Sequence, residues 1–322
     1  MIKHESPSYG WRKFKKDCPL QLLIIHRSLI VTTYYLMIVT LTSLYYKFFM
    51  NILLEILLSI SFLHAKSIIG TVTVVNTENS TFTVFSEGTF YERTITAKVT
   101  AGDVRVGYLN RRIVANLVKT DQGGLWLKTI FPADRDVIDT VTKHQRILRR
   151  NTITRGDQLF RDVGEYLPTF ALFNQSGKLI TPNSLKGKII VLNFIFTRCT
   201  VPEKCPAATI RMVGLQRKAK ESNIKDLQLI TISFDPAFDS PGVLQIYGKG
   251  HGVDFSNFWF LTGNEKIILD LRKQFSIETK QQNGTIKHTM ATVLVDKDVK
   301  IRYYQPGSFW EIDDFIQRIK KL

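Results

Sequence analysis

Residues 189–206 read Ile189-Ile-Val-Leu-Asn-Phe-Ile-Phe-Thr-Arg-Cys199-Thr-Val-Pro-Glu-Lys-Cys205-Pro206. The first eight of these residues are apolar except for Asn193, a pattern that predicts a strand buried on both faces of a sheet. A helical pattern begins after Pro206. The cysteines therefore lie between a buried strand and a helix N-terminus, where the helix dipole favours the thiolate. We expect this pair to have a chemical role.

The composition indicates about two domains with real cores, because the chain has 322 residues of which 44% are hydrophobic. Lys and Arg exceed Asp and Glu by 44 to 28, which gives a formal net charge of +16. Such a charge suits anionic lipid headgroups or acidic protein surfaces. The basic residues are spread along the chain and no nucleic-acid-binding motif is present. We therefore predict a basic, solvated surface on a membrane-attached protein, with no nucleic-acid partner.

Cysteine usage excludes a disulfide scaffold. The sequence contains three cysteines, at positions 18, 199 and 205. Small disulfide-stabilised domains need more cysteines than this. One close pair and one distant cysteine are typical of a redox pair or a metal site.

The N-terminal region predicts membrane attachment. Residues 1–27 form a basic tail, and residues 28–46 carry no charge and are long enough to cross a bilayer. A basic flank stays in the cytoplasm. We assign residues 28–64 to a transmembrane or signal-anchor region, and we expect the soluble domains on the periplasmic, non-cytoplasmic side of an inner membrane.

A second apolar run, residues 48–63, leaves the number of spans open. It contains Glu55 and is the weaker candidate. Two spans would return the globular part to the cytoplasm, whereas one span would export it. A translation start at Met37 or Met50 would turn this run into the core of a signal peptide. We favour export.

Residues 67–132 predict a small all-β domain, an OB-like barrel or a similar one. Five short, β-branched segments are separated by turn signals such as Asp121-Gln-Gly-Gly124. No Cys or His occurs from residue 65 to 143, and no Met between residues 51 and 211. The domain therefore lacks the soft ligands that a Cu(I) site needs. We expect a spacer or docking module.

Residues 133–156 predict a basic linker helix, and residues 157–322 predict an α/β domain. Its expected strands are residues 167–174, 189–196, 227–234, 292–296 and 299–304, with residues 258–261 as a short edge strand. Helices are expected after Pro206 and Pro241, over residues 265–275 and over residues 309–322. A βαβ unit followed by a ββα unit is the thioredoxin-like arrangement.

At this point the C-terminal domain resembles the Sco (SenC/PrrC) family of thioredoxin-like copper chaperones. The motifs that carry the resemblance are Phe194-Ile-Phe-Thr-Arg-Cys199, Cys205-Pro206, Ser233-Phe-Asp-Pro236, Asp239-Ser-Pro241, Trp259-Phe-Leu-Thr-Gly263 and His288-Thr289. They span residues 157–322 and say nothing about residues 1–150. The resemblance implies a membrane-anchored domain that binds copper and serves cytochrome c oxidase assembly. Its acceptor would be a cytochrome c oxidase subunit or another copper-accepting protein.

The resemblance implies Cys199, Cys205 and His288 as metal ligands, and Asp235 as an acidic group that orients the site. Two thiolates and one imidazole suit Cu(I), or a zinc ion that recruits a fourth ligand. The family usually has three residues between its cysteines, whereas this chain has five, Thr200 to Lys204. The longer loop alters the placement of the sulfur atoms, and with it the metal affinity and the redox potential.

Two other function classes remain open. One is a thiol–disulfide oxidoreductase or peroxidase that uses Cys199 and Cys205 as a redox pair. The other is a membrane-tethered interaction protein stabilised by a disulfide. Ordinary thioredoxins have two residues between their cysteines and a proline opposite them, but no proline lies between residues 241 and 306 here. We expect a metallochaperone rather than an enzyme, with thiol–disulfide reductase activity as the alternative.

Overall fold

The computed structural model describes residues 45, 49–50, 66–87, 93–156, 160–282 and 285–322. Residues 65–322 form one compact unit. The predicted basic tail (1–27) lies outside the described residues, and so does nearly all of the predicted membrane segment (28–64). Within the described ranges, no helix combines the length and the hydropathy needed to cross a bilayer.

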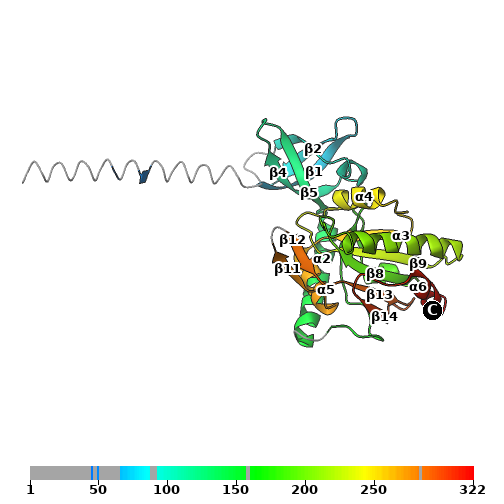
Figure 1. The fold of residues 1–322 in the computed structure, drawn as a ribbon. Helices are drawn as coiled ribbons and strands as arrows, with labels where there is room; N and C mark the ends of the chain where they lie inside the picture. The colour runs from blue at the N-terminus through cyan, green and yellow to red at the C-terminus, as the bar shows by residue number, and fades with distance from the viewer. Residues whose placement is uncertain (1–44, 46–48, 51–65, 88–92, 157–159, 283–284) are drawn as a thin grey trace, which may run out of the picture. The chain divides into compact units, whose positions relative to one another are not determined.

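The compact unit begins with a closed five-stranded barrel (Figure 1). Its elements are β1 (Lys66–Asn76), β2 (Thr81–Glu87), β3 (Arg93–Lys98), the short 3-10 helix η1 (Asp103–Arg105), β4 (Arg112–Lys119) and β5 (Leu125–Pro132). The strand order is β1-β2-β3-β5-β4, and β4 closes the barrel by pairing antiparallel with β1. Alternating side chains such as Val72, Phe82 and Leu127 fill the interior. The predicted all-β barrel is confirmed.

A long helix, α2 (Arg135–Arg155), follows the barrel. Its side chains are mostly polar, and Leu148 and Thr152 are its buried residues. Arg149 pairs with Asp270, and Gln274 donates a hydrogen bond to Thr152, so α2 is fixed to helix α5 (Glu265–Gln274).

The rest of the unit is a seven-stranded sheet with helices against it, the predicted thioredoxin-like arrangement. Its strands are β6 (Leu172–Asn174), β7 (Leu179–Ile180), β8 (Ile189–Ile195), β9 (Leu227–Ser233), β10 (Phe258–Thr262), β13 (Ala291–Val295) and β14 (Ile301–Pro306), and η2 (Pro182–Leu185) follows β7. The order is β14-β13-β8-β9-β10-β6-β7. The other helices are α3 (Cys205–Glu221), α4 (Pro241–Gly250) and α6 (Ile312–Ile319).

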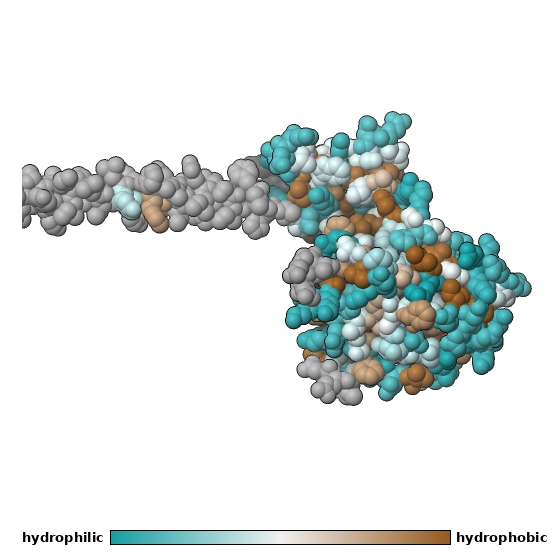
Figure 2. Space-filling view, in the orientation of Figure 1, coloured by the Kyte–Doolittle hydropathy of each residue, from teal (hydrophilic) through white to brown (hydrophobic). Residues whose placement is uncertain are grey.

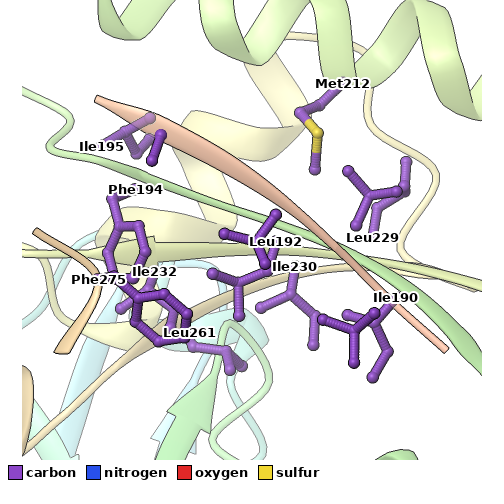
Figure 3. Packing of buried hydrophobic residues seen from close by; sticks show 14 of the residues in the cluster. Ile190, Leu192, Phe194, Ile195, Met212, Leu229, Ile230, Ile232, Leu261 and Phe275 are labelled. Atoms are coloured by element: carbon purple, nitrogen blue, oxygen red, sulfur yellow. The ribbon is translucent and has the colours of Figure 1, made fainter. Parts of the chain in front are cut away.

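Strand β8 is buried along its whole length, as its unbroken apolar run predicts. Helix α3 packs against β8 and β9. Figure 3 shows Met212 of α3 reaching toward Leu229, and Phe275 lying against Phe194. Polar residues cover most of the face shown in Figure 2, in keeping with the predicted solvated surface.

Two details of the sheet differ from the sequence-based expectation. The segment 258–261 is not at an edge, because β10 pairs with β9 on one side and with β6 on the other. The hairpin β6–β7, which precedes β8 in the chain, occupies the outer position. A second hairpin, β11 (Thr279–Gln282) and β12 (Thr285–His288), was not predicted. The dipeptide Asn283-Gly284 is the hairpin signal in the sequence.

Candidate metal centre

The sheet topology brings the cysteine loop and His288 together. Strand β13 lies antiparallel to β8, with Thr292 opposite Asn193. His288 ends β12, three residues before β13 begins at Ala291, and Thr197 follows the end of β8 by two residues, so this pairing brings both segments to the same end of the sheet. Cys205 is the first residue of α3, so the loop after β8 brings the second thiol back to the same end of the sheet.

One ligand atom from each of Cys199, Cys205 and His288 lies within 4.8 Å of the other two. Cys205 Sγ is 3.4 Å from His288 Nε2. Two sulfurs that each lie about 2.3 Å from a metal ion are about 4.6 Å apart when the ion is between them, and closer when a third ligand bends the angle. The spacing of this group therefore fits an ion held by two thiolates and an imidazole.

His288 is held in the orientation and tautomer that a ligand needs. Its Nδ1 donates a hydrogen bond of 2.9 Å to the Thr289 carbonyl oxygen, so Nε2 presents a lone pair to Cys205. The rings of Phe196 and Phe234 pack against the imidazole, at centroid distances of 5.5 and 4.9 Å. Burial lowers the pKa of His288, which keeps the ring neutral and available to a metal.

Cys205 does not behave as the helix-dipole argument predicts. Its side chain is fully buried at the start of α3. Desolvation raises the pKa of the Cys205 thiol, and its electrostatic interactions with Cys199 and Asp239 raise it as well. Burial therefore outweighs the dipole, and the metal-free site holds a thiol here rather than a thiolate. Cys199 is partly exposed, and both cysteines are free.

The acidic residues near the loop act on the residues just before Cys199. Arg198 donates two hydrogen bonds, of 3.0 and 2.6 Å, to the carboxylate of Asp235. The Asp235 backbone carbonyl accepts from the amides of Phe238 and Asp239, so Asp235 also shapes the turn after β9. Among the described residues no hydrogen bond or ion pair joins Asp235 to the three candidate ligands, and its side chain binds Arg198, the residue before Cys199.

Sequence reasoning missed the most deeply buried acid in this region, Asp239. Asp239 directly precedes Ser240, the N-cap residue of α4. The Asp239 side chain is fully buried and accepts hydrogen bonds from the backbone amide and hydroxyl of Thr197 and from Ser233. Its place in the motif Asp239-Ser-Pro241 was the available signal, but a motif does not show which neighbour a side chain reaches.

The comparison with family models decides the assignment: the SCO1/SenC model matches residues 161–322, half of the chain. The chain belongs to the SCO1/SenC family. The predicted resemblance is thus confirmed for the C-terminal half. A curated relative, the SCO1 protein homolog of Bacillus subtilis, is 33% identical over 171 residues, which are 51% of this chain and 87% of that protein.

Two solved structures of Sco proteins are similar to this chain. One is BsSco, described as a member of the Sco family of cytochrome c oxidase assembly proteins, with 32% identity, coverage of 51% of this chain and 96% of that one, and a TM-score of 0.45. The other is ScoI of Bradyrhizobium japonicum with copper bound, with 25% identity, coverage of 50% and 99%, and a TM-score of 0.40.

Proposed function

We propose that this protein is a membrane-anchored copper chaperone, which binds Cu(I) through Cys199, Cys205 and His288 and delivers copper, or reducing equivalents, to a copper site of cytochrome c oxidase. The observation that carries the proposal is the convergence of two sulfurs and one ring nitrogen within 4.8 Å. Soft thiolates with one imidazole are the donor set that Cu(I) prefers. Membership of the SCO1/SenC family supports the same chemistry.

The geometry suggests how the cargo is taken up and released. Cys199 is the partly exposed ligand, so incoming Cu(I) meets it first and then displaces the proton of buried Cys205. His288 Nε2 fills the third position. A groove of about 480 Å³, lined by Lys204, His288, Met290 and other residues, lies beside the imidazole. A ligand of an acceptor protein can approach His288 through this groove and take the ion by ligand exchange.

A thiol–disulfide oxidoreductase is the second candidate, favoured by the closeness of the two free thiols. Cys199 would be the attacking thiol, because Cys205 is buried and its pKa is raised. The position of His288 against Cys205 favours metal binding over this alternative. Oxidation to a disulfide would remove two of the three donors at once, so copper loading is expected to require the reduced protein.

Titration of the reduced protein with Cu(I), in competition with a chromophoric chelator, tests the proposal. We expect one tightly bound ion per chain. Cys199→Ser and Cys205→Ser should each abolish tight binding, because the thiolates supply most of the affinity. His288→Ala should weaken binding and change the X-ray absorption spectrum. If that variant keeps both the affinity and the spectrum, the histidine is no ligand and the oxidoreductase becomes the better explanation.

We also propose that residues 67–322 lie on the non-cytoplasmic side of the membrane. The support is in the sequence, where a basic tail precedes an uncharged run of nineteen residues, Ser28 to Tyr46. A reporter that is active only in an oxidising compartment, fused after Leu322, should be active. Activity of a cytoplasm-specific reporter at the same position would mean that both apolar runs cross the membrane.

A further inference from the structure

The barrel touches the second domain at the N-terminus of helix α4, and two glycines make this contact. A Cβ atom added to Gly102, just before η1, would lie 1.9 Å from the carbonyl oxygen of Gly242. A Cβ atom added to Gly242 would lie 2.1 Å from Oδ1 of Asp103. Figure 1 shows α4 beside the barrel strands. The two backbones therefore meet at a distance that only glycine allows on either side.

Two further contacts fix the barrel in place. Thr129 lies in an irregular part of β5, where the register with β4 shifts, and its φ of +53° is unusual for a β-branched residue. Its hydroxyl donates a 3.4 Å hydrogen bond to the Ala237 carbonyl oxygen. Arg111 donates to the Gly177 carbonyl oxygen at 3.0 Å, in the β6–β7 turn. The barrel is thus attached both to the sheet and to the segment between β9 and α4.

That segment, residues 235–242, is the one that holds the cysteine loop. Asp239 accepts the Thr197 amide at 3.0 Å, and Asp235 accepts two hydrogen bonds from Arg198. Asp239 therefore holds Thr197 and Asp235 holds Arg198, the two residues that directly precede Cys199. On the other side of Cys199 lies the loop of residues 200–204, where the Val201 carbonyl oxygen is 3.9 Å from Cys199 Sγ and Lys204 donates to the His288 carbonyl oxygen. The segment 235–242 thus holds the chain on the N-terminal side of Cys199.

We propose that the barrel is a positioning module for the metal site, an inference that rests on the proposed copper function. The barrel holds residues 235–242 through Gly102 and Thr129, and this segment holds Cys199 at the correct distance from Cys205 and His288. Gly102, Gly242 and Asp239 are positioning residues, since in the described part of the chain none of them hydrogen-bonds to a candidate ligand. The barrel thereby contributes to metal binding although it has no soft ligand of its own.

Glycine-to-alanine variants of the full chain test this inference. Gly102 has helical backbone angles, φ −72° and ψ −44°, and Gly242 lies in α4. Alanine suits both conformations better than glycine does, so the barrel contact alone opposes the substitution. Gly102→Ala and Gly242→Ala should each lower Cu(I) affinity roughly tenfold, as loss of outer supporting contacts does at other metal sites. The alkylation rate of Cys199 in the metal-free protein should change as well.

Matched controls are available on each side of the contact. Gly107 in the barrel and Gly250 at the end of α4 have no atom within 4 Å of an added Cβ. Gly107→Ala and Gly250→Ala should leave both the Cu(I) affinity and the Cys199 alkylation rate unchanged. Far-UV circular dichroism and the melting midpoint show that each variant is folded at the assay temperature, which separates repositioning of Cys199 from general destabilisation.

The outcomes distinguish this inference from the function on which it rests. If the wild-type protein binds no Cu(I), the chaperone function fails, while the alkylation rates still report on positioning. Folded Gly102→Ala and Gly242→Ala proteins with wild-type affinity and alkylation would overturn the positioning role. If both variants unfold, Thr129→Val decides, since it removes one hydrogen bond without a steric clash. We expect it to shift the alkylation rate in the same direction, and no shift would refute the inference.

Discussion

Cys205 and His288 form a neutral pair in the metal-free protein. Burial raises the pKa of the thiol and lowers the pKa of the imidazole, so both groups lose their charge near neutral pH. The 3.4 Å distance between Sγ and Nε2 then corresponds to a thiol that donates to the ring nitrogen. The site avoids burying a lone charge while it is empty, but it must lose a proton to bind a metal.

The first prediction concerns this proton. Cu(I) binding at pH 7 should release a proton from Cys205, so the apparent affinity should fall as the pH falls. Calorimetric titration in buffers of different ionisation enthalpy measures the release directly. A binding heat that does not depend on the buffer would mean that Cys205 is already a thiolate or does not bind the metal.

Asp103 is a second residue whose charge state depends on burial. It is 2% exposed, and one of its carboxylate oxygens has no hydrogen-bond partner. Desolvation raises the pKa of Asp103 from 3.8 to about 6, against hydrogen bonds from Thr100 that lower it. The folded protein therefore holds a proton that the unfolded chain releases at lower pH. Protonated Asp103 thus contributes stability to the fold. This contribution is complete below pH 3.8 and is lost as the pH rises through 6.

The second prediction follows from this sign. Between pH 4 and pH 7 the Asp103 carboxyl should cost the folded state up to about 3 kcal/mol, which is the pKa difference converted to free energy. Asp103→Asn, which stays neutral, should remove that part of the pH dependence. Chemical denaturation at several pH values measures it. A variant whose stability falls with pH as steeply as the wild type would show that Asp103 has an ordinary pKa.

At the scale of elements, helix α2 is attached to α5 through a buried carboxylate. Asp270 is 1% exposed, and Arg149 reaches it at 3.0 Å from a half-exposed position. Removing the arginine leaves the carboxylate without its charged partner. Because water still reaches half of the Arg149 side chain, the loss is smaller than for a fully buried pair.

The third prediction is that Arg149→Ala lowers the free energy of unfolding by about 1–2 kcal/mol. Arg150→Ala is the matched control, since the exposed Arg150 side chain is on the same helix and has no recorded partner among the described residues. It should stay within about 0.5 kcal/mol of the wild type. Equal losses for the two variants would mean that the loss reflects helix composition and that the pair with Asp270 adds no stability.

Elements with strong local signals were predictable, and elements defined by their partners were not. The unbroken apolar run of β8 and the β-branched segments of the barrel can be recognised as strands from the sequence alone. The position of β10 inside the sheet depends on β6, which pairs with it across more than eighty residues of sequence. The same holds for the site: Cys199 and Cys205 stand out by spacing, whereas the hydrogen bond from Thr197 to Asp239 exists only in the folded chain.

At the scale of the whole molecule, the barrel and the sheet share one compact unit but differ in chemistry. In the described residues, the group Cys199, Cys205 and His288 is the sole candidate metal site. The barrel supports that site through its contacts with residues 235–242 and supplies no metal ligand of its own. A truncated protein that begins at residue 157 therefore also lacks the contacts through which the barrel holds residues 235–242.

The spacing of the three ligands also affects how much a bound metal stabilises the fold. Cys199 and Cys205 are near neighbours in sequence, whereas His288 is 83 residues beyond Cys205. An unfolded chain already offers both thiols to Cu(I), and a ligand that also binds the unfolded state stabilises the native one less than its affinity suggests. The share contributed by His288, together with a smaller gain from the positioning of Cys199, favours the folded form. Cu(I) should therefore raise the melting midpoint of the protein modestly. His288→Ala should remove most of that rise while copper stays bound. A large rise that survives in the variant would show that the native cysteine pair binds copper far better than the unfolded chain does.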